Sequence, residues 1–139
     1  MRTSKIFVTT DAVIFRRRGN GHEILFIKRK NDPFKGQWAI PGGFVDEGED
    51  LPDAARRELK EETGLEVEKL EQLAAFGKPG RDPRQHTVSI AYVGFATENA
   101  EATGADDADE AEWFPVDNLP ELAFDHAEIV GMAIERYLK

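Results

Sequence analysis

The stretch GFVDEGEDLPDAARRELKEETGL, residues 43–65, decides both the fold and the chemistry expected of this chain. Its second half predicts a helix over Leu51–Thr63. Asp50 can cap the start of that helix, Pro52 suits its first turn, and Gly64 can end it. The helix carries several glutamates, and their positions around its axis determine what it can bind.

The glutamates of this helix fall on the face expected to pack inward. Residues are 100° apart around a helix, which puts Glu58 and Glu62 on the stripe of its apolar residues and Glu61 at the edge. Two carboxylates one turn apart repel each other, and burial increases the repulsion unless a cation is bound. Carboxylate oxygens without cysteine or histidine suit Mg²⁺ or Mn²⁺. The alternative is a merely acidic helix that is paired with Arg57 and Lys60.

Composition places the chain among ordinary globular domains. Its 139 residues are the length of one domain, and 40% of them are apolar and 32% charged. The absence of cysteine excludes disulfides and thiolate metal sites, and three histidines are too few to favour a histidine-built zinc site. The longest apolar runs are too short to span a membrane or to form a signal peptide. We therefore expect a cytoplasmic protein without a membrane partner.

Charge is distributed unevenly along the chain. The net charge of −9 argues against general binding of nucleic acid. Residues 1–30 nevertheless carry a net charge of +6, whereas residues 46–62 carry −5. This division suggests a cation site beside an anion site, and solvated surface is the alternative.

The remaining sequence predicts a mixed sheet with helices packed on it. Strands are expected over residues 6–17, 23–30, 67–76, 87–97 and 111–116, and a second helix is expected over residues 126–138. Asp125 and Glu128 form a variant of the capping box at the start of that helix. This order predicts an α+β fold in a single domain over residues 1–139.

The spacing within residues 43–65 resembles the signature of the Nudix hydrolases, G-x5-E-x7-R-E-U-x-E-E-x-G-U, where U is aliphatic. Gly43, Glu49 and residues 57–65 match every specified position. The resemblance implies the α/β/α sandwich of that family, with the mixed sheet between helices. It also implies hydrolysis of a nucleoside diphosphate linked to another group, with Mg²⁺ or Mn²⁺ as cofactor. A small nucleotide is the expected partner, and a homodimer is compatible with the resemblance.

The same resemblance implies roles for individual residues. The expected metal contacts are Glu58, Glu62, Glu61 (directly or through water) and the backbone carbonyl of Gly42. Arg57 is expected to orient Glu49 or one of the metal-binding glutamates through a salt bridge. This would place a positive side chain among the carboxylates of the helix without making it a metal ligand.

A proton acceptor for the attacking water is expected from the acidic segment at residues 106–112. In several Nudix enzymes, a glutamate of the equivalent loop acts as general base or as a further metal ligand. We select Glu110, because the helix glutamates are occupied by cations and a base must come within reach of the attacking water. For most acids of this segment the alternative is solvated surface.

Two segments outside the signature, residues 32–45 and 77–86, resemble the branch of the family that hydrolyses ADP-ribose. In the second of them, Pro79 is associated with that substrate class. The expected reaction is hydrolysis of ADP-ribose to AMP and ribose 5-phosphate. The alternative enzyme is a nucleoside triphosphate pyrophosphohydrolase that cleanses the nucleotide pool.

Four side chains outside the helix are candidates for binding the substrate. Arg81 and Arg84, on a loop stiffened by proline, are suited to contact phosphates or the terminal ribose. Arg29, on a neighbouring strand, is suited to bind phosphate, and Trp38 to stack on adenine. The alternatives are a solvated turn for the loop arginines, a surface charge for Arg29, and core packing for Trp38.

A function without catalysis is the third interpretation. Some transcription regulators carry a Nudix-like domain that senses its ligand, followed by a winged-helix segment. We expect a non-catalytic sensor of ADP-ribose or nucleotides least, because all the glutamates of the signature are present. In addition, the chain ends at Lys139, which leaves no room for a winged helix.

Overall fold

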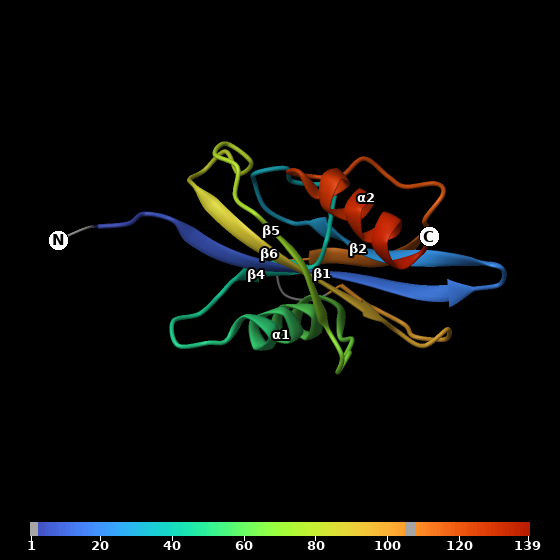
Figure 1. The fold of residues 1–139 in the computed structure, drawn as a ribbon. Coiled ribbons are helices and arrows are strands. Elements are labelled where there is room, and N and C mark those ends of the chain that lie inside the picture. Colours follow the sequence, from blue (N-terminus) through green and yellow to red (C-terminus); the bar gives the residue numbers. More distant parts are fainter. Residues whose placement is uncertain (1–2, 105–107) are drawn as a thin grey trace.

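A mixed sheet with two helices forms the part of the chain that the structure, a computed structural model, describes: residues 3–104 and 108–139. The elements are β1 (Phe7–Arg18), β2 (Gly21–Arg29), β3 (Trp38–Ala39), β4 (Gly42–Phe44), α1 (Leu51–Thr63), β5 (Glu71–Phe76), β6 (Thr87–Phe95), β7 (Ala108–Pro115) and α2 (His126–Tyr137). The helices lie on opposite faces of the sheet, α1 below and α2 above in Figure 1. The predicted α+β sandwich is confirmed.

The sheet divides at one end. Its strand order is β3-β2-β1-β6-β5, with β1 and β6 parallel. β1 pairs with β2 through Phe15–Arg18 and with β4 through Thr9–Asp11, while β2 pairs with β3 at Ile27 and Lys28. β1 and β2 therefore diverge, and the two short strands fill the space between them.

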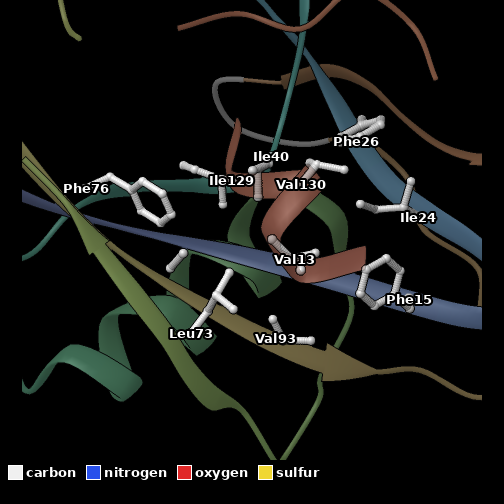
Figure 2. Close-up of a cluster of buried hydrophobic side chains, with 12 residues drawn as sticks. Val13, Phe15, Ile24, Phe26, Ile40, Leu73, Phe76, Val93, Ile129 and Val130 are labelled. Atoms are coloured by element: carbon white, nitrogen blue, oxygen red, sulfur yellow. The ribbon is translucent and has the colours of Figure 1, made fainter. Parts of the chain in front are cut away.

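Each face of the sheet carries its own hydrophobic core. Figure 2 shows the core on the α2 face, where Val13 and Phe15 of β1 meet Ile129 and Val130 of α2. Side chains alternate between the faces of a strand, so the intervening Ile14 packs with the α1 side. The apolar run at the centre of β1 is thus explained by burial on both faces.

The ends of the two helices differ in how they are capped. Asp50 accepts a hydrogen bond from Leu51 N at 2.9 Å, and Gly64 ends α1 with a left-handed φ of 76°, both as predicted. The predicted capping box of α2 is wrong, because Asp125 makes no side-chain cap and binds Arg81 instead. Within the described residues, neither helix is long and apolar enough to cross a membrane.

Strand boundaries account for most other differences from prediction. The sequence predicts no strand at β3 and β4, because they are two or three residues long and contain no alternation; they form through pairing with β2 and β1. β5 begins at Glu71 rather than Val67, and Val67 packs against the core on the α1 face. β7 begins at Ala108 rather than Ala111, because its pairing with β2 extends as far as Arg29.

Gly64 and Gly131 provide a matched test of the end of α1. A Cβ would meet nothing within 4 Å at either position, but only Gly64 has a left-handed backbone. Gly64→Ala should lower the free energy of unfolding by about 1–2 kcal/mol. Gly131→Ala, inside α2, should raise it by about 0.5–1 kcal/mol. Urea unfolding measures both, and shifts of the same sign would contradict the left-handed cap.

Candidate active site

A cavity of about 340 Å³ opens where β1 and β2 diverge. Segments far apart in the sequence line it: α1 with Glu58 and Glu62, β4 with Gly42 and Gly43, the β5–β6 loop with Arg81 and Arg84, and the segment entering α2 with Phe124 and His126. Carboxylates and arginines that are far apart along the chain therefore line one cavity.

Two carboxylates of α1 lie against the glycine pair of β4. Glu62 is 6% exposed, and its Oε1 accepts a hydrogen bond from Gly42 N at 2.7 Å. The Glu58 carboxylate fills the space that a side chain would need at Gly43, since a Cβ there would lie 2.6 Å from Glu58 Cδ. Gly43 is thus required for the close approach of helix and strand.

Arg57 holds the neighbouring carboxylates together. Its Nε and Nη2 donate to both oxygens of Glu49, at 2.8 and 3.0 Å. Its Nη1 donates to Glu58 at 3.0 Å and to Glu61 at 3.2 Å. The hydrogen bonds from Arg57 lower the pKa of Glu49 from 4.5 to about 2, and the bond with Glu49 in turn raises the pKa of Arg57. Arg57 thus offsets the repulsion among these carboxylates.

The oxygen atoms at this end of the cavity suit a divalent ion. Glu58 and Glu62 supply two carboxylates beside the main chain of Gly42, and all of these donors are hard oxygens. Among the described residues, no three Asp, Glu or His side chains could hold an ion by themselves. Mg²⁺ is usually held by one or two carboxylates together with water and substrate phosphates, so this donor set fits such an ion.

The opposite wall carries an arginine in a fixed orientation. Arg84 Nε and Nη2 donate to the two oxygens of Asp82, at 3.1 and 2.8 Å. Burial opposes the ionisation of Asp82, but the hydrogen bonds from Arg84 outweigh it and lower the pKa of Asp82. The guanidinium lies 5.4 Å from the ring centroid of Phe44 and 6.0 Å from that of Phe124. The pair with Asp82 does not use Nη1.

The other two arginines are held differently. The Arg81 side chain is 5% exposed, and its Nε and Nη2 donate to Asp125 at 2.8 and 2.6 Å. Arg81 therefore anchors the β5–β6 loop to the start of α2. The Arg29 guanidinium lies 5.0 Å from the ring centroid of Phe124, so that Arg29 and Arg84 both contact this ring.

Trp38, the candidate for stacking on adenine, packs in the core. Its ring meets that of Phe114 edge to face, with 4.9 Å between the centroids. Both rings pack against the core on the α2 face, and Trp38 does not line the cavity. The aromatic rings that do line it are Phe44 and Phe124.

Glu110, the candidate proton acceptor, lies on β7 opposite Lys28, and its carboxylate is 3.7 Å from Lys28 Nζ. The next residue, Ala111, packs on the α1 side of the sheet, so Glu110 points to the α2 side. The structure does not bring Glu110 to the carboxylates of α1. Asp106 and Asp107 of the same acidic segment lie outside the described residues.

Asp11, Phe124 and His126 line the cavity but were not predicted as site residues. Asp11 is buried and accepts a hydrogen bond from the Ser89 hydroxyl. His126 is buried and accepts one from Ile40 N at 3.0 Å, and burial lowers its pKa. Asp11 did leave a signal in the sequence: it is a carboxylate directly before an apolar run in a strand.

The NUDIX domain family matches residues 6–131 of the chain. The chain belongs to the Nudix family. This confirms the resemblance found in the sequence. A solved structure of the Nudix domain of Shewanella oneidensis NrtR, complexed with ADP ribose, has a TM-score of 0.90 and 32% identity to this Nudix chain. The match covers 96% of this chain and 90% of that one.

The chain is also similar in sequence to two curated relatives. An ADP-ribose pyrophosphatase from Methanocaldococcus jannaschii is 50% identical over 78% of this Nudix chain and 64% of its own length. The ADPR responsive transcriptional repressor NtrR from Acinetobacter baylyi is 35% identical over 93% of this chain and 53% of its own length. The chain thus spans half to two thirds of these relatives.

The second solved structure is a bifunctional NMN adenylyltransferase/ADP ribose pyrophosphatase from Francisella tularensis, complexed with AMP and a Mn ion. It has a TM-score of 0.80 and 28% identity, and the match covers 98% of this Nudix chain and 43% of that one. The Nudix fold of the chain is therefore shared with proteins that were solved with a nucleotide and with a divalent ion.

Arg57→Gln tests how the carboxylates are held. Glu49 in the unsubstituted protein should show no titration between pH 3 and 7, whereas in the variant its pKa should rise toward 4.5. The stabilisation from ionised Glu49 is present above pH 4.5 and is lost as the pH falls toward 2. Carboxyl ¹³C chemical shifts measure the titration. Arg56→Gln, whose guanidinium pairs with Asp53, should leave Glu49 unchanged.

Proposed function

We propose that this protein hydrolyses the diphosphate of a nucleoside diphosphate linked to another group, with ADP-ribose as substrate and AMP and ribose 5-phosphate as products. The observation that carries the proposal is the single cavity that joins the carboxylates of α1 to arginines held beside aromatic rings. A diphosphate between two nucleoside or sugar groups needs both kinds of partner. The identity to the ADP-ribose pyrophosphatase of M. jannaschii supports the choice of substrate.

Mg²⁺ or Mn²⁺ is the proposed cofactor, held by Glu58, Glu62 and the backbone carbonyl of Gly42, with Glu61 in contact directly or through water. Such an ion, when bound, neutralises charge on phosphate oxygens and lowers the pKa of a bound water. The Mn ion in the structure of the F. tularensis relative supports this choice. Arg57 keeps the glutamates in place before the ion arrives, because it contacts Glu58 and Glu61 at once.

The arginines have unequal roles in this proposal. Arg84 binds a phosphate or the terminal ribose, and its pairing with Asp82 means that little further ordering is needed on binding. Arg29, which contacts the same Phe124 ring, binds phosphate beside Arg84. Arg81 acts on the substrate indirectly, since its side chain is buried in the pair with Asp125 and fixes the loop that carries the more exposed Arg84.

The position of the proton acceptor stays a prediction. To act as the proton acceptor, Glu110 would have to meet the attacking water on the α2 side of the sheet, where its carboxylate pairs with Lys28. The homodimer and the cytoplasmic location expected from the sequence also stay predictions. None of these three points is needed for the roles given above to α1 and to the arginines.

Glu58→Gln and Glu62→Gln should each lower turnover of ADP-ribose by about 100-fold or more, because a neutral amide cannot replace a carboxylate at the ion. Chromatography of AMP formed with Mg²⁺ measures the loss. The melting temperature without metal should be unchanged or slightly raised, since repulsion between the carboxylates is relieved. Glu66→Gln, which affects an exposed pair with Lys60, is the control. Normal turnover in both variants would reject the metal site.

Arg84→Ala should lower kcat/KM for ADP-ribose by roughly 5- to 150-fold. This corresponds to a loss of about 1–3 kcal/mol in the stabilisation of the transition state. Hydrolysis of a nucleoside triphosphate should suffer less, because it lacks the terminal ribose. Arg84→Lys should fall between, since lysine keeps the charge but cannot form the two-point contact with Asp82. Equal losses on both substrates would mean that the loop does not select the substrate.

A domain that binds ADP-ribose without hydrolysing it is the second candidate. The identity to the ADPR responsive repressor of A. baylyi and the likeness to the NrtR domain complexed with ADP ribose favour it. Calorimetry with ADP-ribose, set beside the hydrolysis assay with Mg²⁺ and Mn²⁺, separates the two candidates. Binding without any product would favour the sensor, and faster hydrolysis of triphosphates would favour the pyrophosphohydrolase expected as the alternative enzyme.

A further inference from the structure

His126, the first residue of α2, joins that helix to the main chain between β3 and β4. The ring is 5% exposed and lines the cavity. Its Nδ1 accepts a hydrogen bond from the buried Ile40 N at 3.0 Å. Its Nε2 lies 3.8 Å from Asp11 Oδ1, beyond hydrogen-bond distance. Among the described residues, the hydrogen bond of the imidazole is therefore with the main chain of Ile40, and the ring also lies 5.4 Å from the Phe124 ring, centroid to centroid.

The direction of this hydrogen bond fixes the form of the ring. A backbone N–H can only donate, so Nδ1 must carry a lone pair, and the ring proton must be on Nε2. Burial lowers the pKa of His126, which favours the same neutral form. His126 thus acts toward Ile40 purely as an acceptor, and an uncharged acceptor at the same place would serve equally.

Ile40 begins the short crossing from β3 to β4, and each following residue is held by a different element. Pro41 O accepts from Ala12 N of β1 at 2.8 Å. Gly42 N donates to Glu62 of α1 at 2.7 Å. The main chain at Gly42 lies close against β1, since a Cβ there would be 2.2 Å from a main-chain oxygen of that strand. His126 is the contact that fixes the crossing from the α2 side.

We propose that His126 is a positioning residue, which holds the N–H of Ile40 so that Gly42 presents its N–H to Glu62 and its carbonyl to the divalent ion. The part that concerns the ion rests on the proposed function. Groups that orient metal ligands from outside usually change metal affinity by about 10- to 100-fold when they are removed. We expect an effect of that size although His126 itself does not contact the ion.

Two amide variants separate the role of Nδ1 from the presence of a polar side chain. The amide oxygen of asparagine is two bonds from Cβ, like Nδ1, whereas the amide of glutamine ends where Nε2 lies. His126→Asn should therefore keep the bond to Ile40 and most of the affinity for Mn²⁺. His126→Gln should lose the bond and weaken Mn²⁺ binding by about 10-fold or more. His126→Leu, which removes every acceptor, should weaken it at least as much.

The experiment titrates Mn²⁺ into the full chain, alone and with AMP to supply a phosphate, and follows free Mn²⁺ by electron paramagnetic resonance. Val130→Ala, a buried change in the same helix but away from the cavity, is the control. It should lower the melting temperature without changing Mn²⁺ affinity. Should His126→Leu fail to fold, the comparison of the Asn and Gln variants still decides the outcome.

The possible failures are distinguishable. If the unsubstituted protein binds no Mn²⁺, the proposed metal-dependent function fails. If it binds Mn²⁺ and the Gln variant binds equally well, the positioning role of His126 is overturned. Equal losses in the Asn and Gln variants would also overturn it, because the acceptor at Nδ1 would then not be the group that matters.

Discussion

The divergence of β1 and β2 is the constraint on which the rest of this structure depends. Where two strands part, their backbone groups lose their partners, and buried groups of that kind must find others. Here β4 pairs with one half of β1, and Pro41 O and His126 accept from the main chain of Ala12 and Ile40. The opening that remains connects the two faces of the sheet, which is why carboxylates from one side and arginines from the other reach a common cavity.

Charge balance within this cavity is local rather than global. The carboxylates at this end of the cavity lie close together because Arg57 contacts Glu58 and Glu61 of α1 together with Glu49, which precedes the helix. On the opposite wall, Arg84 is bound to Asp82 and Arg81 to Asp125. The net charge of the chain therefore says little about what the cavity attracts. What matters is that the fold places an arginine beside each cluster of acids, and that the pair of Arg84 with Asp82 does not use its Nη1.

Features that depend on local sequence were predictable, and those that depend on distant contacts were not. Glu58 and Glu62 could be placed together because their spacing on one helix fixes their direction. Arg81 and Arg84 look alike in the sequence. Arg84 nevertheless pairs with Asp82, two residues away, whereas Arg81 pairs with a residue 44 positions away.

The same limit applies to the remaining site residues. The hydrogen bond between His126 and Ile40 joins positions 86 residues apart, so no local pattern indicates it. For Glu110 the face of the sheet depends on the register of β7, and a shift of a single residue exchanges the two faces.

Because the cavity is assembled from residues as distant as Asp11 and His126, it exists only in the completed fold. Any partly unfolded form that releases α2 or β1 loses a wall of the cavity and with it the affinity for ligand. Ligand binding and folding are then linked by mass action: a ligand at 100 times its Kd adds about 2.7 kcal/mol to the free energy of unfolding. The concentration of ligand around the protein therefore helps to set how long the folded chain survives proteolysis.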